Sequence, residues 1–315
     1  MNSRRTFLKN VSLAGAGLGL GAWSSPPEAR RIGLIGLDTS HSEVFTRLIH
    51  ESSSYKVVAA CAQGSRDIPS ALQLKPGVTA AVQKMGVELV GSIAELLDKV
   101  DCVLLETNDG RPHLEQVLPV LKAGKRVFVD KPLAASLADA EAILQAAEDT
   151  KTPLFTSSAL RFDVSVQKVV QGSVGPVTGA DVYAPATLEP HHLDLAWYAI
   201  HGVEMLCTVM GTGCKRLSRV YQDGTDLVTA VWEDGRIGTV RGIRKGASNI
   251  AGTAFGEKGI APLGPFASYQ PLVDRIVRFF DTGEPPVTPR QTLEIFRFLD
   301  ATDKSRRKGG KTIAL

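Results

Sequence analysis

Short apolar runs alternate with longer amphipathic stretches through the first half of the chain. The first run begins at residue 31 and leads through a tight turn into a helix that extends to residue 50. The pattern predicts further strands at residues 56–62, 88–90, 101–106, 126–129 and 153–156, and helices at residues 93–99, 112–123 and 134–149. Such alternation is typical of a parallel sheet that helices cover on both faces.

Local signals indicate where some of these elements begin. Ser40 with Glu43, and Ser92 with Glu95, have the spacing of a capping box, which predicts that each pair opens a helix. Residues 64–86 contain prolines and show no clear periodicity, so we expect an irregular segment between the second and third strands.

The pattern changes near residue 152. Alternating strands at residues 227–232, 236–243 and 249–255 predict an antiparallel sheet with one open face, which favours a homo-oligomer. Further helices are expected at residues 191–210, 269–281 and 289–304. The predicted fold class is α/β: a Rossmann-like parallel-sheet domain at residues 30–152, and an α+β domain with a mostly antiparallel open sheet at residues 153–315, whose C-terminal helix packs back.

Residues 1–29 are predicted to be an export signal that does not belong to the fold. Arg4 and Arg5, followed by Phe7 and Lys9, precede an apolar stretch at residues 11–23, which is the arrangement of a twin-arginine signal. The expected partner is the twin-arginine export machinery, and the expected location is periplasmic or otherwise extracytoplasmic. No clear cleavage site follows, so an uncleaved anchor stays open as an alternative.

Composition narrows the class of partner. The 315 residues are 43% hydrophobic, which is enough for two domains. The chain has 36 basic and 33 acidic side chains and no basic run outside the ends, so its sequence shows no basic patch of the kind that binds nucleic acid. Small molecules are therefore the expected partners. Cys61 and Cys102 lie in apolar runs, and Cys207 and Cys214 have no C-x-x-C spacing, so all four cysteines are predicted to be buried free thiols.

The turn after the first strand holds part of a dinucleotide-binding fingerprint. Gly36 supplies the first glycine of G-x-G-x-x-G, but Asp38 and His41 stand at the second and third positions. The second strand ends at Ala62 and Gln63, without the acidic residue that usually binds the adenosine ribose. A carboxylate beside a diphosphate costs about 1–4 kcal/mol, unless Asp38 caps the helix and points away from the ligand.

Three segments resemble the Gfo/Idh/MocA family of sugar-active oxidoreductases. They are Thr107 and Asn108 with the later His113, the Lys-Ala-Gly-Lys run at residues 122–125, and residues 127–132, which end in Asp-Lys-Pro. Residues 159–162, 172–177 and 283–315 are similar to the domain junction and closing elements of that family. The resemblance implies a carbohydrate substrate and NAD or NADP, held by Gly33, Gly36, Asp38, Thr39, Ser40, His41, Thr107, Asn108 and Asp130.

The resemblance also implies two catalytic residues. Lys131 corresponds to the lysine that reaches the reacting hydroxyl, and His201 to the acid or base on the long helix of the second domain. Trp197 occupies the position of the family's aspartate, so Glu204, one turn ahead, is expected to orient the imidazole in its place. The alternatives are a solvated lysine and a histidine packed within a helix interface.

Five residues are candidates for substrate contact. Each has a structural alternative as a cap, a packing contact or a domain-junction ion pair. They are His113, Arg161, Tyr198, Glu204 and Asp194.

Several polar residues follow parallel strands and should meet at one edge of the sheet, where such folds bind ligands. They are Asp38, His41, Glu106, Asp109 and Asp130. Carboxylates with an imidazole suit a divalent metal or a direct sugar contact. Their spacing is not that of a known metal motif, so none is assigned as a metal ligand.

Three functions follow. The first is an exported enzyme that oxidises or reduces a carbohydrate hydroxyl with NAD or NADP, as a net reaction or transiently within glycoside cleavage. The second is a carbohydrate hydrolase or lyase that uses the same crevice without a nucleotide. The third is a sugar-binding protein that has lost its chemistry. Lys131 and His201 argue against the third, whereas Asp38 and Trp197 argue against the first.

Overall fold

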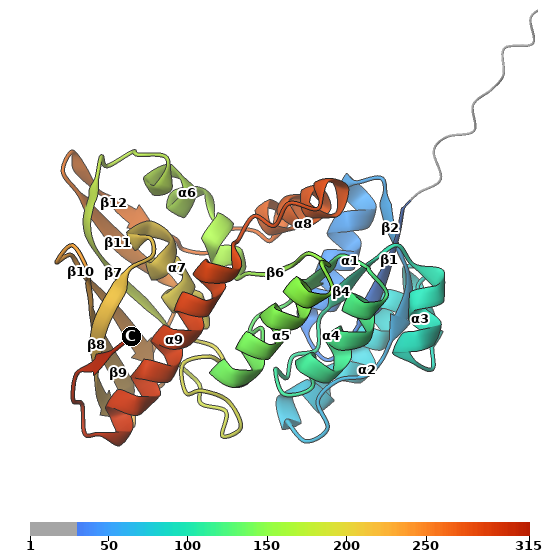
Figure 1. Ribbon diagram of the computed structural model, residues 1–315, viewed down its shortest axis with the longest axis horizontal. Helices are drawn as coiled ribbons and strands as arrows, with labels where there is room; N and C mark the ends of the chain where they lie inside the picture. The colour runs from blue at the N-terminus through green and yellow to red at the C-terminus, as the bar shows by residue number, and fades with distance from the viewer. Residues whose placement is uncertain (1–29) are drawn as a thin grey trace, which may run out of the picture.

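The computed structural model describes residues 30–315, so the predicted export signal lies outside the described residues. The first part of the chain forms a parallel six-stranded sheet in the order β3-β2-β1-β4-β5-β6 (Figure 1). This doubly wound order places the carboxyl ends of all six strands at one edge, where the order reverses between β1 and β4. The strands are β1 (Arg30–Ile35), β2 (Tyr55–Cys61), β3 (Glu88–Val90), β4 (Cys102–Leu105), β5 (Val127–Val129) and β6 (Leu154–Thr156).

Helices cover both faces of this sheet because successive strand residues point to opposite sides. Phe128 of β5 packs on the face that carries Phe45, whereas its neighbours Val127 and Val129 pack on the face that carries Leu96. The helices are α1 (Ser40–Ser52), α2 (Pro69–Lys84), α3 (Ile93–Lys99), α4 (His113–Lys122) and α5 (Leu137–Asp149). The predicted Rossmann-like architecture is confirmed.

The second part forms a seven-stranded sheet in the order β12-β11-β7-β10-β9-β8-β13. Strands β7 and β10 pair in parallel, and the other neighbouring strands pair antiparallel, which confirms the mostly antiparallel sheet. The strands are β7 (Val177–Pro185), β8 (Cys214–Gln222), β9 (Thr225–Trp232), β10 (Ile237–Ile243), β11 (Ala251–Gly256), β12 (Gly259–Leu263) and β13 (Ile313–Ala314).

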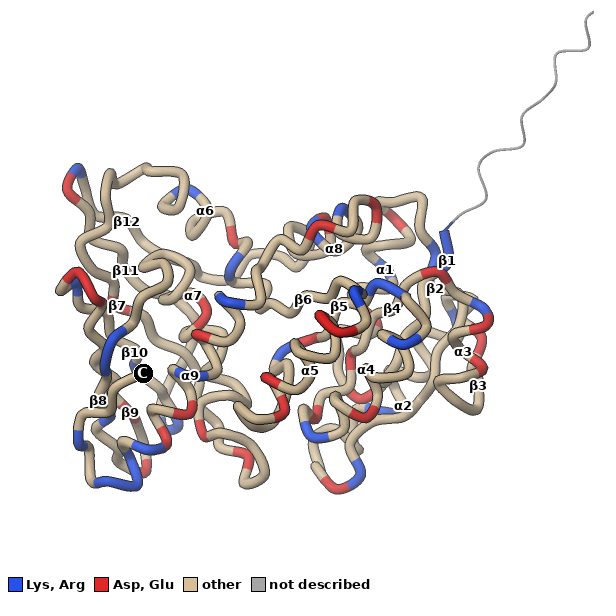
Figure 2. The backbone as a smooth tube through the Cα atoms, viewed as in Figure 1, with Lys and Arg blue, Asp and Glu red and all other residues tan. Residues whose placement is uncertain are grey.

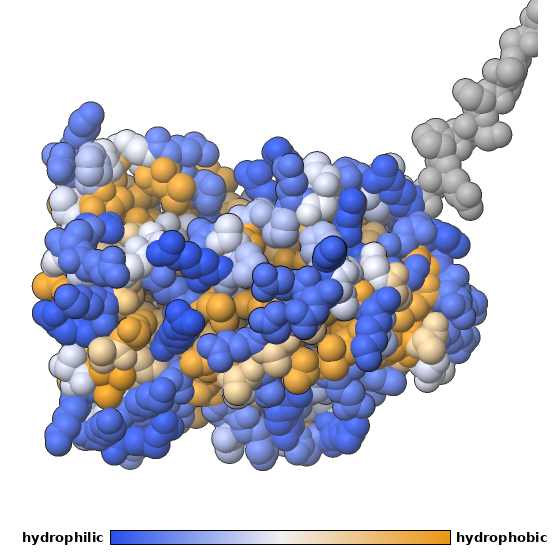
Figure 3. Space-filling model, viewed as in Figure 1, coloured by the Kyte–Doolittle hydropathy of each residue, from blue (hydrophilic) through white to orange (hydrophobic). Residues whose placement is uncertain are grey.

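One face of the second sheet is covered and the other is open. Val203 and Leu206 of α7 (Ile200–Met210) pack against Val240 on the covered face. The open face exposes Tyr183 and Ile237, which are 39% and 53% accessible. Figure 3 shows that apolar side chains reach the surface in both halves of the molecule. Self-association through the open face stays a prediction.

Two C-terminal helices connect the halves. Ile276 and Phe279 of α8 (Gln270–Thr282) join the core under the first sheet, and Phe296 of α9 (Pro289–Arg307) joins the core on its other face. Phe298 and Leu299 of α9 pack under the second sheet instead. The remaining short helices, η1 (Ala159–Phe162) and α6 (Val164–Val170), lie where the chain passes from one half to the other. The division after residue 152 stays a prediction, although β6 belongs to the first sheet.

Two local predictions in the first half were wrong. The segment expected to be irregular contains α2, which begins with Pro69 in the first helical turn, where a missing N–H group is tolerated. Helix α1 is capped by Thr39, whose hydroxyl accepts the N–H of His41, and not by Ser40. At α3 the predicted cap Ser92 is confirmed.

The helix predicted at residues 191–210 was also too long. Residues 190–199 form turns, and α7 begins only at Ile200. The backbone N–H of Leu193 donates to the carbonyl of Ala135, and the N–H of Asp194 donates to the Asp303 carboxylate. Tertiary partners therefore take the hydrogen bonds that a helix would need.

The charge pattern and the cysteines can be compared with the expectations from the sequence. Basic and acidic residues are interspersed in both halves (Figure 2). The four cysteines are free thiols, as predicted. Within residues 30–315, no helix has the length and apolar character needed to cross a membrane.

Candidate functional site

The turn after β1 is filled by the Asp38 carboxylate. Its Oδ2 accepts the N–H of Ser65 at 2.7 Å, and its Oδ1 accepts the N–H of Asn108 at 3.0 Å. Asp38 therefore joins the loops after β2 and β4, and it does not cap α1. Burial raises the pKa of Asp38, while these hydrogen bonds oppose the increase.

The neighbouring glycines show how tightly the loops approach. Gly36 has φ +91°, and a Cβ there would lie 2.3 Å from the N atom of Thr107. A Cβ on Gly64 would lie 2.6 Å from Oδ2 of Asp38. The first glycine of the fingerprint thus has its usual steric role, whereas Asp38 takes up space that the second glycine leaves free.

His41 connects the turn to the end of β5. Its Nδ1 lies 2.7 Å from Oδ2 of Asp130, and its Nε2 lies 3.1 Å from the hydroxyl of Tyr269. Although burial acts to raise the pKa of Asp130, the charge and hydrogen bond of His41 lower it. Burial and the Asp130 charge raise the pKa of Tyr269 to about 12, so its hydroxyl stays neutral.

Glu106 lies beside this group at the end of β4. Its side chain is fully buried, and neither carboxylate oxygen has a hydrogen-bond partner among the described residues. Burial and the Asp130 charge raise the pKa of Glu106 well above its usual value.

Lys131 and His201 are brought to the same edge from opposite halves of the molecule. They are 7% and 8% accessible. Burial, followed by the charges of Lys131 and His41, lowers the pKa of His201 well below its ordinary value. Its Nδ1 lies 2.7 Å from Oγ of Ser158, and the Tyr198 ring meets it edge-on with centroids 5.7 Å apart. Tyr198 is 43% accessible and can meet a ligand from solvent.

Glu204 does not contact the imidazole, contrary to prediction. Its carboxylate accepts hydrogen bonds from Oγ of Ser157 and the backbone N–H of Ser158, and it pairs with Nε of Arg161 at 2.7 Å. Glu204 therefore acts on His201 only through the backbone that carries Ser158. Arg161 itself is 6% accessible, which favours a role as a buried ion-pair partner at the domain junction over contact with the substrate.

Two other predicted substrate residues are engaged elsewhere. Both ring nitrogens of His113 meet backbone carbonyls, of Leu133 at 3.0 Å and of Thr107 at 2.8 Å, and burial lowers its pKa. Oδ2 of Asp194 meets Arg219 at 2.8 Å and Arg306 at 2.5 Å. These contacts favour structural roles for His113 and Asp194, as a packing contact and an ion-pair partner, over contact with the substrate.

The remaining predicted cofactor residues differ in accessibility. Ser40 is exposed and Asn108 is half-buried, so both can meet a ligand, whereas Thr39 and Thr107 are buried. Gly33 lies within β1, where a Cβ would be 2.9 Å from the Leu96 side chain, so it serves helix packing.

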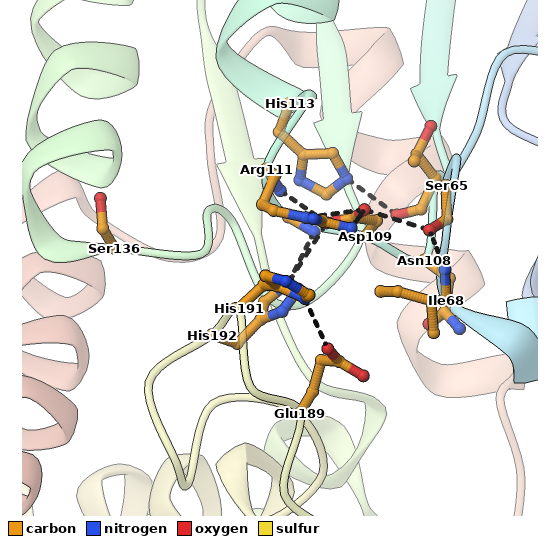
Figure 4. Close-up of polar contacts among 12 residues, drawn as sticks. Ser65, Ile68, Asn108, Asp109, Arg111, His113, Ser136, Glu189, His191 and His192 are labelled. Carbon is orange, nitrogen blue, oxygen red and sulfur yellow. Dashed lines mark hydrogen bonds and ion pairs between the residues drawn. The ribbon is translucent and has the colours of Figure 1, made fainter.

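Asp109 organises a second polar group beside the turn (Figure 4). It accepts hydrogen bonds from Oγ of Ser65 at 3.1 Å and from the Arg111 guanidinium, which also pairs with Asp67. Nε2 of His192 accepts the N–H of Gly110 at 3.0 Å, and burial lowers the pKa of His192 to about 4. A cavity of about 230 Å³ opens here between the loops after β2 and β4, lined by Gly64, Arg66, Asp67, Asp109, Arg111, Pro112 and Glu115.

Sequence reasoning missed two residues of the site. Ser158 follows β6 by two residues, so the strand-end argument could have found it. Tyr269 precedes α8, and only the packing of α8 against α1 brings it to His41. No local signal identifies such a contact.

Comparison with known proteins identifies relatives. Residues 30–158 match the Gfo/Idh/MocA model, described as an oxidoreductase family with an NAD-binding Rossmann fold. A myo-inositol 2-dehydrogenase of Thermotoga maritima is 28% identical over 67% of this chain and 62% of its own length. Inositol 2-dehydrogenase 3 of Saccharopolyspora erythraea is 28% identical over 56% of this chain and 52% of its own. The matches thus span only about half to three fifths of these two relatives.

Solved structures share the fold over a larger part of the chain. A putative myo-inositol dehydrogenase from Sinorhizobium meliloti has a TM-score of 0.75 at 17% identity, over 90% of this chain and 99% of its own. A scyllo-inositol dehydrogenase from Lactobacillus casei, solved with NAD(H) and scyllo-inositol, has a TM-score of 0.73 at 17% identity, over 91% of this chain and 99% of its own. At this identity the likeness shows a common fold.

Proposed function

We propose that the protein interconverts a hydroxyl and a carbonyl of a sugar or an inositol with NAD(H), because residues 30–158 match the model of the Gfo/Idh/MocA oxidoreductase family. The observation that carries this proposal is the position of Lys131 and His201 at the carboxyl edge of the parallel sheet, close enough that the Lys131 charge helps to keep His201 neutral. The inositol dehydrogenases among the relatives support a polyol substrate.

The turn keeps part of a dinucleotide site. Gly36 keeps its close approach to Thr107, Ser40 is exposed at the start of α1, and the cavity beside Arg66 lies between the loops that follow β2 and β4. These features would hold the diphosphate and the adenosine half. Asp38 opposes the fit, because its carboxylate occupies the backbone N–H groups of Ser65 and Asn108.

Lys131 and His201 are the residues that transfer the proton of the substrate oxygen. NAD(H) supplies the hydride when it is bound. Lys131, which is 7% accessible at this edge, offers its amine to the substrate oxygen. His201 is neutral at neutral pH because its pKa is lowered, and it can donate Nε2–H to the same oxygen. The exposed ring of Tyr198 offers a surface for the apolar face of the ligand.

A second function is favoured by the Asp38 contacts. A hydrolase or lyase that acts on carbohydrate without a nucleotide would need no diphosphate site, and the buried Asp38 carboxylate would then fix the loops permanently. Lys131 and His201 would serve proton transfer in that chemistry as well.

We also propose that the chain is exported through the twin-arginine pathway, as residues 3–23 indicate. Replacing Arg4 and Arg5 by Lys in the full chain should leave the protein in the cytoplasm, as cell fractionation would show. Export of the double variant at the wild-type level would contradict this proposal.

One experiment separates the two functions. The purified protein is denatured, and the released nicotinamide dinucleotide is measured by absorbance and mass. Release of about one dinucleotide per chain, or a thermal shift with added NAD(H) or NADP(H), supports the oxidoreductase. Absence of both overturns dinucleotide use and favours the second function.

A further inference from the structure

Three side chains that the proposed reaction does not use converge at the ends of β4 and β5. His41, Glu106 and Asp130 each offer one ligand atom, and these atoms lie within 4.8 Å of one another. The three side chains come from the start of α1 and from the residues that directly follow β4 and β5. Their residues are 8%, 0% and 1% accessible, so bulk water does not solvate them.

Three of the four carboxylate oxygens of this cluster lack hydrogen-bond partners within residues 30–315. Both oxygens of Glu106 and Oδ1 of Asp130 are buried without a hydrogen bond among the described residues. A buried acceptor without a partner costs about 1–3 kcal/mol, and more when it carries charge. A single proton shared by the two carboxylates would pair one oxygen of Glu106 with Oδ1 of Asp130, but the other oxygen of Glu106 would still have no partner. One cation would satisfy all of them.

We propose that His41, Glu106 and Asp130 bind a divalent transition-metal ion. One imidazole nitrogen with two carboxylates suits Mn²⁺, Fe²⁺ or Zn²⁺, whereas Mg²⁺ and Ca²⁺ prefer oxygen ligands alone. Two carboxylates balance the charge of the ion. The proposed dinucleotide site uses Gly36, Ser40 and the cavity beside Arg66, and not His41 and Asp130 as the resemblance implied, so this inference stands independently of it.

Tyr269 is positioned to support the histidine ligand. Its hydroxyl lies 3.1 Å from Nε2 of His41 and can accept the proton of that nitrogen. This leaves the Nδ1 lone pair for the metal, which would replace the present 2.7 Å contact between Nδ1 and Asp130. Hydrogen bonds of this kind fix the tautomer and orientation of a ligating imidazole.

The competing occupants are a proton and the Lys131 ammonium. Lys131 acts electrostatically on both carboxylates, and His41 acts on Asp130. A protonated Glu106 together with Lys131 would neutralise the cluster without metal. The raised pKa of Glu106 is consistent with either occupant, because a metal would displace the proton.

The test is metal analysis of the full chain. The protein is purified without chelators and its metal content is measured by inductively coupled plasma mass spectrometry. After dialysis against EDTA, Mn²⁺ and Zn²⁺ are titrated separately by calorimetry, with no dinucleotide present. We expect about one ion per chain with 1:1 stoichiometry, and a higher melting temperature in the presence of the ion.

Two variants locate the site. Glu106→Gln has nearly the same shape and should lower the affinity for the ion at least tenfold, whereas the control Glu115→Gln, on α4, should not change it. Tyr269→Phe should weaken binding about tenfold to a hundredfold. If neither ion binds the wild-type protein, or if Glu106→Gln binds it equally well, the proposal is wrong. Because wild-type binding is measured directly, the test holds even if a variant fails to fold, and its result does not depend on NAD(H).

Discussion

The Ser158 hydroxyl lies 2.7 Å from Nδ1 of His201 and takes the place of an acidic partner for this imidazole. Oγ of Ser158 also accepts the N–H of Leu160 at 3.1 Å, and we assign its own proton to the hydrogen bond with Nδ1. The proton of the neutral imidazole is thereby assigned to Nε2, the nitrogen that remains for a ligand. His201 therefore presents a hydrogen-bond donor, which suits the oxygen of a carbonyl.

Removal of the Ser158 hydroxyl tests this arrangement. Ser158→Ala leaves Nδ1 of His201 without its donor, so either tautomer can form and the orientation of the ring is lost. We expect kcat/KM to fall by about tenfold to a hundredfold, in the lower range of acid–base effects, and its pH dependence to change. Thr156→Val, which removes a nearby buried hydroxyl with no hydrogen-bond partner, is the matched control and should leave the pH profile unchanged. Equal profiles for Ser158→Ala and the wild type would contradict the assigned tautomer.

Stability should depend on pH through His192. Its folded-state pKa of about 4 lies below the ordinary 6.5, so the unfolded chain binds the proton more readily between these values. Stability is therefore fully present above pH 6.5 and decreases as the pH falls toward 4, by about 3 kcal/mol from this group. Urea unfolding at a series of pH values measures the decrease, to which other buried histidines also contribute.

The control for that measurement is His192→Gln, which removes the titrating group. Its amide oxygen can still accept a hydrogen bond, as Nε2 of His192 does from Gly110. We expect a shallower dependence of the free energy of unfolding on pH in this range. If the free energy of unfolding of the variant falls with pH as steeply as that of the wild type, the decrease comes from groups other than His192.

The periodicity of the chain was sufficient to predict the first sheet. Because β-α alternation is a local pattern and parallel strands end at one edge, the convergence of His41, Glu106 and Asp130 could be expected before any coordinates. The hydrogen bonds of the Asp194 and Leu193 N–H groups could not be predicted, because their acceptors are distant in sequence. These bonds explain why the segment predicted to be helical forms turns.

The same limit explains the errors within the site. Glu204 stands one helical turn from His201, so the sequence favoured a direct contact between them. In the structure Arg161 and the backbone of Ser158 hold the carboxylate, and both come from the junction after β6. Periodicity describes which residues share a helix face, but it contains no information on what packs against that face.

The Arg161–Glu204 pair should stabilise the fold. Both residues are buried, and removing one partner leaves an uncompensated charge, so Arg161→Leu should destabilise the protein by about 3–5 kcal/mol in urea unfolding. Gln167→Leu, which loses a hydrogen bond to the Arg161 carbonyl without exposing a buried charge, is a milder control. If Arg161 instead contacts substrate, Arg161→Leu would raise KM while the melting temperature stays near the wild-type value.

Asp38 is the residue that decides whether a dinucleotide fits. Asp38→Gly restores the second glycine of the fingerprint and removes the negative charge, so the Kd for NAD(H) or NADP(H) should fall by about tenfold to a thousandfold. The same change releases the N–H groups of Ser65 and Asn108, so some loss of stability accompanies the gain. Asp38→Asn is the matched variant, since it removes the charge and keeps the shape; it should show the electrostatic part of the gain alone. Calorimetric titration of the three proteins measures the difference. If both variants bind the dinucleotide more weakly than the wild type, the carboxylate supports the nucleotide site by holding its loops in place, and it is not the obstacle.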